Sequence, residues 1–389
     1  MNNPAPHRLT ATFAYYVTFI TLGATMALAG PALPFLANNT ASRIDQISII
    51  FVASSLGYMI GSLISGRAYD RLPGHRLQAA AMLMIAAGAA LVPVMHTLWF
   101  LVAVLFLLGI FQGTLDVGCN TLLTWIHGEK VGPFMNGLHF FFGLGSVLAP
   151  LLFARLVGAG IAMRWTYWFF AVLALPVAAW LWLLPSPAIR AKLPEAAGAR
   201  STNSLFIAIV FFFILTVGIE LGFGNWINTY SINIKLASTT QAAYLTSAFW
   251  GAFTLARLMG IGISRLLKAH TILLVDLGGC LAACAVLLLW PNSGVALWSG
   301  AILMGLSIAS VFATTMAFTE KHVHLTGALV GWIFVGSGIG GMVIPWLVGQ
   351  LFQRISPRVT VPIILVDAVL AFALLIGILG MVKRRQEIV

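Results

Sequence analysis

The feature that most constrains the fold of this chain is a series of long apolar segments along almost its whole length. A helix needs about 20 apolar residues to cross the hydrocarbon core of a bilayer. Of the 389 residues, 60% are hydrophobic and only 8% are charged, whereas about a quarter of the residues of a soluble domain are charged. The sequence therefore predicts an all-α membrane protein. The twelve expected helices span residues 10–37, 46–69, 78–96, 98–126, 133–158, 163–185, 204–231, 241–266, 272–290, 295–318, 327–352 and 360–382.

Lysine and arginine residues between the apolar segments predict the orientation of the chain. With the N-terminus in the cytoplasm, the inner connections and helix ends carry fourteen such residues and the outer ones six. Because cytoplasmic loops are enriched in these residues, we expect a multi-pass protein of the plasma (cytoplasmic) membrane with both termini in the cytoplasm. The net charge of +11 is explained in this way, so no nucleic-acid partner is expected. We expect a monomer in the lipid bilayer, without a metal site.

The second half of the chain repeats the first. Matching residues recur at an offset of 194 or 195, and an even number of spans in each half makes the two copies parallel. This predicts two six-helix halves, residues 1–185 and 204–389, joined by a cytoplasmic connector at 186–203. Transporters built from such halves bind substrate near the bilayer midplane between them. The matching pairs are Gly57 with Gly251, Gly66 with Gly260, Arg71 with Arg265, Gly143 with Gly338, Gly145 with Gly340 and Pro150 with Pro345.

Asp116 lies inside the expected helix 98–126. A carboxylate at the centre of a bilayer costs about 3 kcal/mol even on the membrane-insertion scales that give the lowest cost. It therefore normally faces the interior of a helix bundle or a watery cavity. Gln112 and Asn120 lie four residues to either side, which places all three on one helical face. Such a polar stripe is typical of the wall of a path for a polar solute or an ion. The alternative is a structural pair between Asp116 and a basic residue of another helix.

A second polar cluster lies in the expected helix 204–231. Glu220 stands among three glycines and precedes Asn225, Trp226 and Asn228. Glycines allow a helix to bend or unwind beside a cavity. Amides next to an aromatic ring suit a sugar, because amides bond to hydroxyl groups and the ring covers an apolar sugar face. We therefore predict the two asparagines and the tryptophan as substrate contacts; the alternative is helix packing, which uses the same residue types.

Two further side chains are predicted to contact the substrate, His139 and Trp332. A histidine in a helix can donate a hydrogen bond to a ligand or titrate near neutral pH. The alternative for His139 is packing between helices.

Arg257 is the basic residue expected deepest in a span. We expect it to form a structural pair with Asp276 of the following helix, and Glu220 is the alternative partner. A similar expectation holds for Asp367 near the end of the chain, which is predicted to pair with one of two arginines, Arg354 or Arg358.

The connection between the second and third expected helices carries the sequence GRAYDRLPGHR. It resembles the signature loop of the major facilitator superfamily, in which a glycine, an aspartate–basic pair, a second glycine and further basic residues follow in order. The resemblance implies that the aspartate helps to close the inner gate by charge pairing and helix capping. The spacing here is one residue longer than the common one. The gating residues expected on this basis are Gly66, Asp70, Arg71, Gly74 and Arg76.

Longer segments in both halves carry a closer resemblance, among them SSLGYMIGSLISGRAYDR, LDVGCNTLLTWIHGEKVGPFMNGLHFFFGLGSVLAPLL and GIELGFGNWINTYSI. Together they are similar to the sodium-dependent glucose transporter branch of the superfamily and, more distantly, to the fucose permeases. In the fucose permeases an acidic residue precedes an asparagine by four positions, as Asp116 precedes Asn120 here. The resemblance implies that Asp116 takes part in cation coupling and that Asn120 contacts the sugar. The fucose permeases also use an aspartate in helix 1, which has no counterpart in residues 10–37.

On this basis we expect a symporter of a sugar or similar polar solute, coupled to sodium or to a proton, that works by alternating access and needs no cofactor. Asp116 and Glu220 are the candidates for ion coupling, and Gln112 is a further candidate for substrate binding. An exporter of drugs or metabolites on the same fold is the nearest alternative and predicts a more apolar cavity. A membrane-embedded enzyme would need a nucleophile paired with a base, or a metal cluster, and the sequence offers neither. A sensor that does not transport predicts ligand binding without flux.

Overall fold

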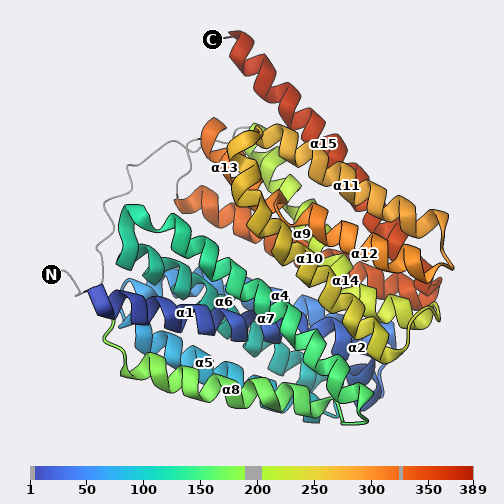
Figure 1. Cartoon of the computed structure of the whole chain (residues 1–389), viewed down its shortest axis with the longest axis horizontal. Coiled ribbons are helices and arrows are strands. Elements are labelled where there is room, and N and C mark those ends of the chain that lie inside the picture. The colour runs from blue at the N-terminus through green and yellow to red at the C-terminus, as the bar shows by residue number, and fades with distance from the viewer. Residues whose placement is uncertain (1–4, 189–203, 324–326, 389) are drawn as a thin grey trace. The chain divides into compact units, whose positions relative to one another are not determined.

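The computed structural model describes residues 5–188, 204–323 and 327–388, and these ranges consist of helices and short connections (Figure 1). This confirms the predicted all-α fold. The helices before residue 189 are α1 (Ala5–Ala27), α2 (Ala29–Asn39), α3 (Ile44–Ile47), α4 (Ile49–Tyr69), α5 (Gly74–Leu91), α6 (Leu98–His127), α7 (Gly132–Gly158) and α8 (Arg164–Leu183). Those after residue 203 are α9 (Ser204–Asn233), α10 (Thr239–Leu266), α11 (Ala269–Leu289), α12 (Gly294–Ile308), α13 (Val311–His322), α14 (Gly327–Arg354) and α15 (Thr360–Ile388). Three 3₁₀ turns, η1 (Val92–Val94), η2 (Gly128–Lys130) and η3 (Pro357–Val359), complete the order.

Eleven helical segments in the described ranges are long and apolar enough to cross a membrane. Helix α10 is not among them by composition, because it carries Arg257 and Arg265 together with several hydroxyl and amide side chains. Its 28 residues nevertheless give it a length of about 42 Å, more than the hydrocarbon core requires. The protein is therefore a multi-pass membrane protein.

The expected helix 46–69 divides near its start, at Ser48, into α3 and α4. Two other expected helices are interrupted well inside their span. The first ends at Ala27 and restarts as α2 at Ala29, because Pro31 has no N–H to donate to the carbonyl group four residues earlier. The expected helix 295–318 divides into α12 and α13 at Ala309 and Ser310. No proline lies at this second break, but side chains of α10 and α11 contact it.

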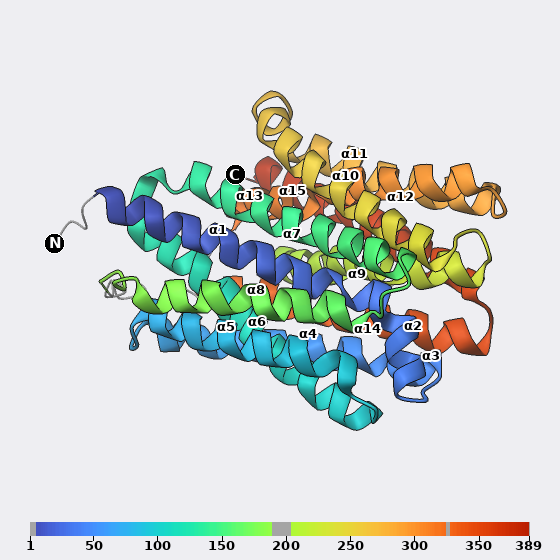
Figure 2. The ribbon, with the colours of Figure 1, turned by 60° about the horizontal axis from the view of Figure 1, so that its bottom comes forward.

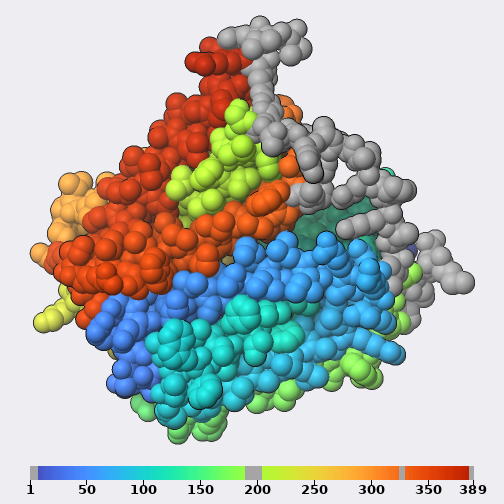
Figure 3. Space-filling view, turned by 180° about the vertical axis from the view of Figure 1, so that it is seen from behind, coloured from blue at the N-terminus to red at the C-terminus, as the bar shows by residue number. Residues whose placement is uncertain are grey.

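The described residues form two compact units. The first holds α1 to α8 together with Thr239–Ser247 at the start of α10, and the second holds α9, the rest of α10 and α11 to α15. Within the first unit α4 packs along α6, α1 along α7 and α5 along α8 (Figures 1 and 2). In the space-filling view of Figure 3, α4, α5 and α6 form one continuous face of this unit, in blue to teal. The expected division at 186–203 stays a prediction, since residues 189–203 lie outside the described ranges.

Both units contain the same close contacts between helix backbones. In each case a glycine of one helix lies directly against a carbonyl oxygen of its partner, where a Cβ atom would collide with the backbone. The positions of these contacts recur after 194 to 196 residues, which agrees to within one residue with the offset of the sequence repeat. Small residues of this kind let transmembrane helices approach closely. The equivalent contacts are Gly145 on Ile20 and Gly340 on Ile214, and Gly109 on Ser54 and Gly305 on Phe249.

Candidate functional site

The contact between α4 and α6 determines where Asp116 lies. A Cβ atom on Gly61 of α4 would be 2.7 Å from the carbonyl carbon of Ile110 in α6. One on Gly113 of α6 would be 2.7 Å from Oγ and 3.0 Å from the backbone nitrogen of Ser62 in α4. Because glycines stand at these points, the two backbones touch, and side chains on either side of the contact reach the facing helix.

The Asp116 carboxylate is bonded on both of its oxygens. The hydroxyl group of Tyr58 in α4 donates to Oδ2. Nδ2 of Asn120 donates to Oδ1 at 2.9 Å and to the backbone oxygen of Asp116 at 2.9 Å. Asp116 lies about one turn from the middle of the 30-residue helix α6 and is half-buried. Both of these donors are neutral, and a carboxyl group at membrane depth that accepts from neutral donors can also take up a small cation or a proton.

The other members of the polar stripe bond to different neighbours. Nε2 of Gln112 donates to Oγ1 of Thr25 in α1 at 3.2 Å, and both side chains are buried. The stripe therefore connects α6 with α1 at one point and with α4 at another. His139 of α7 lies edge-on to the ring of Phe19, with 6.0 Å between the ring centres.

Tyr58 is the main partner that the sequence analysis missed. It stands one residue after Gly57 in α4, so a pairing of the glycine pattern of α4 with that of α6 would have pointed to it. A second missed network lies at one end of the first unit, where the buried imidazole of His75 bonds through Nε2 to the hydroxyl of Tyr15 at 2.6 Å. Its Nδ1 lies 3.3 Å from the carbonyl oxygen of Leu184, so this histidine joins α1, α5 and the end of α8.

The residues of the signature loop occupy the turn between α4 and α5. Asp70 is the C-cap of α4. A Cβ atom on Gly74 would be 2.6 Å from a methyl carbon of Leu122, so this glycine lets α5 pack against α6, whereas nothing lies within 4 Å of the same position on Gly66. Arg71 is exposed, and the guanidinium of Arg76 lies 5.8 Å from the ring centre of Trp182. The gating roles of these residues stay predictions.

Helix α9 runs without interruption from Ser204 to Asn233, so the glycines near Glu220 serve close packing rather than a bend. The indole of Trp226 is fully buried, and its Nε1 donates to the carbonyl oxygen of Pro345 in α14 at 2.9 Å. Asn228 is also fully buried, and neither atom of its amide has a hydrogen-bond partner among the described residues. Asn225 is half-buried, and Trp332 of α14 is 60% exposed. Their roles in substrate binding stay predictions.

The break between α12 and α13 is contacted by two charged side chains. Nε of Arg257 donates to the carbonyl oxygen of Ala309 at 3.3 Å, and its guanidinium lies 4.4 Å from the ring centre of Phe253. The hydroxyl of Ser310 donates to Oδ2 of Asp276. Arg257 and Asp276 thus bond to adjacent residues of the break. Direct pairing between the two stays a prediction. Arg257 also interacts electrostatically with Glu220, the alternative partner.

The prediction for Asp367 is wrong. Nη2 of Arg358 donates to Oδ1 of Asn292 at 2.7 Å, and Nη2 of Arg354 lies 3.5 Å from Oε1 of Gln350. Asp367 itself is 3% exposed, and neither of its oxygens has a hydrogen-bond partner in the part of the chain that the structure describes. Both arginines lie close to the start of α15 and turn toward neutral side chains there.

Known proteins share this architecture. The chain is 29% identical over 374 residues to sodium-dependent glucose transporter 1A of Mus musculus, and the match covers 86% of this chain and 88% of that protein. It is 30% identical over 361 residues to sodium-dependent glucose transporter 1 of Xenopus laevis, covering 84% and 72%. The fold is similar to that of a mutant of the nucleoside transporter NupG, with a TM-score of 0.76 over 96% of this chain and 99% of that one. At 15% identity this last likeness concerns the fold alone.

A family model covers most of the chain as well. It matches residues 15–345, from the middle of α1 to the proline of α14. Together with the all-helical membrane fold, this match identifies a secondary transporter and not an enzyme, as the sequence predicted. The chain belongs to the Major Facilitator Superfamily.

Proposed function

We propose that this chain is a cation-coupled symporter of a sugar or a similar polyhydroxylated solute, with Asp116 as the residue that couples solute movement to sodium or to a proton. The observation that supports this most is the state of the Asp116 carboxyl group. It lies at membrane depth on a close-packed helix pair and accepts hydrogen bonds from the neutral groups of Tyr58 and Asn120. Intramembrane acids of this kind mark ion and proton paths.

The bonds of Asp116 suggest how coupling works. Both neutral donors stabilise the carboxylate when no cation is present, because hydrogen bonds to a charged group are the stronger ones. A sodium ion or a proton on Oδ2 competes with the hydroxyl of Tyr58 and releases it. Cation binding then changes the contact between α4 and α6, which is the kind of small local change that an alternating-access cycle can use.

The candidates for contact with the solute are amide, imidazole and aromatic side chains. Gln112, Asn120 and His139 are the candidates in the first unit, and Asn225, Asn228 and Trp332 are the candidates in the second. Asn228 fits best by its chemistry, because an amide without partners in the described residues can bond to a hydroxyl group without first breaking another bond. The relatives named sodium-dependent glucose transporters support a hexose as the first substrate to test.

The test is uptake into proteoliposomes that contain the purified protein. Labelled hexoses are supplied with an inward sodium gradient at equal pH, or with an inward proton gradient without sodium, and nucleosides are run as competing substrates because of the fold likeness to a nucleoside transporter. Asp116→Asn is compared with Asp276→Asn, which makes the same change in a carboxyl group of another helix.

We expect one gradient to drive hexose uptake in the wild type and in Asp276→Asn, and neither gradient to drive it in Asp116→Asn. Exchange of labelled for unlabelled hexose without a gradient should survive in Asp116→Asn, since the solute site is intact there. Concentrative uptake that persists in Asp116→Asn would refute the coupling role. A folded wild-type protein that moves no hexose under either gradient would refute the sugar assignment.

A further inference from the structure

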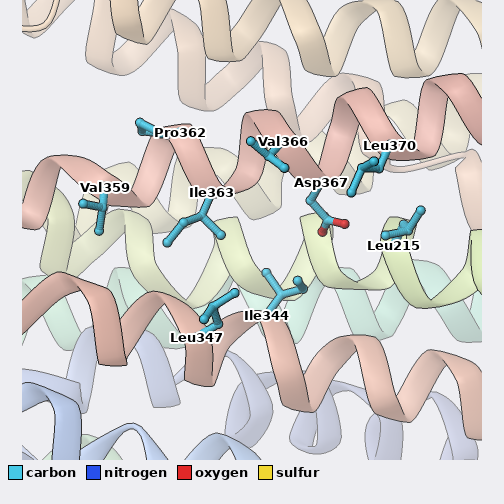
Figure 4. A pocket seen from close by; sticks show the side chains of 9 residues that line it. All are labelled: Leu215, Ile344, Leu347, Val359, Pro362, Ile363, Val366, Asp367 and Leu370. Atoms are coloured by element: carbon cyan, nitrogen blue, oxygen red, sulfur yellow. The ribbon is translucent and has the colours of Figure 1, made fainter.

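Asp367 lies in a pocket of about 360 Å³ in the second unit. The pocket is formed by α9, α14, η3 and the start of α15, and Figure 4 shows the carboxyl group pointing between α15 and α9. Apart from Asp367, all of the side chains that line it are apolar: Leu215, Ile344, Leu347, Val359, Pro362, Ile363, Val366 and Leu370. Its volume falls at the lower end of the roughly 300–1,000 Å³ range of small-molecule sites.

Space for the carboxyl group is provided by a glycine of α9. A Cβ atom on Gly218 would lie 2.8 Å from Oδ2 of Asp367 and 2.6 Å from Ile344. The carboxyl group therefore rests on the backbone of α9, but it has no hydrogen-bond donor in the part of the chain that the structure describes. A buried charge is strongly unfavourable unless it is paired and hydrogen-bonded. The carboxyl group is therefore neutral in the empty pocket, and it becomes charged when a cationic donor from outside these residues binds to it.

The chemistry of the pocket restricts what that donor can be. A buried water needs two to four polar partners, and here a single side chain is polar. Calcium or magnesium needs about six oxygen ligands, and two oxygens are present. A polar solute would lose its bonds to water against the apolar walls. An organic ammonium ion fits the pocket, because its N–H group can donate to the carboxyl group and its hydrocarbon part can pack against the apolar walls.

We propose that this pocket binds a lipophilic amine in its ammonium form, whose N–H group donates to Asp367 and whose hydrocarbon body packs against Ile344, Ile363 and Val366. Asp367 follows the start of α15 by seven residues, or about 10 Å along the helix. An amine that partitions into one leaflet of the bilayer reaches this depth from the lipid. The site is separate from Asp116 and serves a different class of ligand from the polar solute proposed above.

The experiment measures the melting temperature of the purified protein in lipid nanodiscs while N,N-dimethylcyclohexylamine is titrated. Isopropylcyclohexane, which has the same shape without the charge or the N–H group, is the control compound. The variants are Asp367→Asn, which keeps the shape of the carboxyl group, and Val366→Phe, which reduces the pocket at a position that is 59% exposed. Asp116→Asn is the matched control for the other intramembrane aspartate.

We expect a saturable rise of about 3 °C or more in the wild type and in Asp116→Asn, because a ligand that binds only the folded state stabilises it. The rise should be absent in Asp367→Asn and in Val366→Phe, and isopropylcyclohexane should produce none. Each variant is compared with its own ligand-free melting temperature, so a variant of lower stability can still show whether the amine raises that temperature. The proposal is overturned if the amine leaves the wild type unchanged, if the rise persists in Asp367→Asn, or if the neutral compound raises the melting temperature equally.

Discussion

The close contact between α4 and α6 predicts a specific cost for the change Gly61→Ala. The added Cβ atom would lie 2.7 Å from the carbonyl carbon of Ile110 and 2.8 Å from its Cα, while ordinary contacts of a Cβ atom begin at 3.4 Å. The two backbones have to separate by at least about 0.7 Å (3.4 − 2.7). Because a helix backbone cannot rotate away as a side chain can, this separation displaces the whole contact.

The size of the effect follows from a comparison with Gly66→Ala. Both glycines lie in α4, and nothing lies within 4 Å of a Cβ atom on Gly66. Replacing glycine by alanine inside a helix gains up to about 1 kcal/mol through helix propensity, and this gain is common to both variants. Overpacking typically costs about 1–3 kcal/mol. The difference in stability between the two variants therefore reports the contact itself, and we expect Gly61→Ala to be the less stable by about 1–3 kcal/mol.

The assay is the apparent melting temperature of each variant in the same nanodiscs at one scan rate, since unfolding of a protein of this kind is governed partly by kinetics. At about 2–4 °C per kcal/mol, Gly61→Ala should melt several degrees below Gly66→Ala. A melting temperature of Gly61→Ala equal to or above that of Gly66→Ala would show that the backbones do not touch. The same comparison in the second unit uses Gly340→Ala, whose Cβ atom would lie 2.9 Å from the carbonyl carbon of Ile214.

Three further substitutions test single hydrogen bonds. Tyr58→Phe removes a donor that stabilises the cation-free form of Asp116, so the cation concentration for half-maximal uptake should fall about tenfold or more; an unchanged cation dependence in proteoliposomes would contradict this. Trp226→Phe removes the hydrogen bond from the buried indole to the carbonyl of Pro345 and should cost about 1–3 kcal/mol of stability, measured as a lower melting temperature. A change in substrate half-saturation without loss of stability would instead favour a role in solute binding. Ser310→Ala removes the donor to the half-buried carboxylate of Asp276 in α11 and should lower the melting temperature, whereas Ser310→Thr, which keeps the hydroxyl, should leave it unchanged.

Features that depend on neighbours along one helix could be predicted from the sequence. The apolar segments gave helix positions to within a few residues, and the bond between Asp116 and Asn120 follows from their spacing of four. The break after Ala27, inside the expected helix 10–37, has a visible signal as well, the proline at position 31.

Features that depend on which helices meet could not be predicted in this way. Tyr58 reaches Asp116 only because two glycine patterns face each other, and no single-helix argument contains that pairing. The break at Ala309 has no proline and is contacted by side chains from α10 and α11. Asp367 was assigned to an arginine by proximity along the chain, whereas the packing of α15 on α9 turns its carboxyl group into an apolar pocket.

The repeated glycine contacts bear on how a protein of this length could arise. Each contact joins helices of one unit, and its counterpart lies at the same place in the other unit. A chain of half the length would therefore already contain these close helix contacts. Duplication of such a gene would join two units that each carry them, and later divergence could act on the polar side chains while the glycines kept the helix pairs in place.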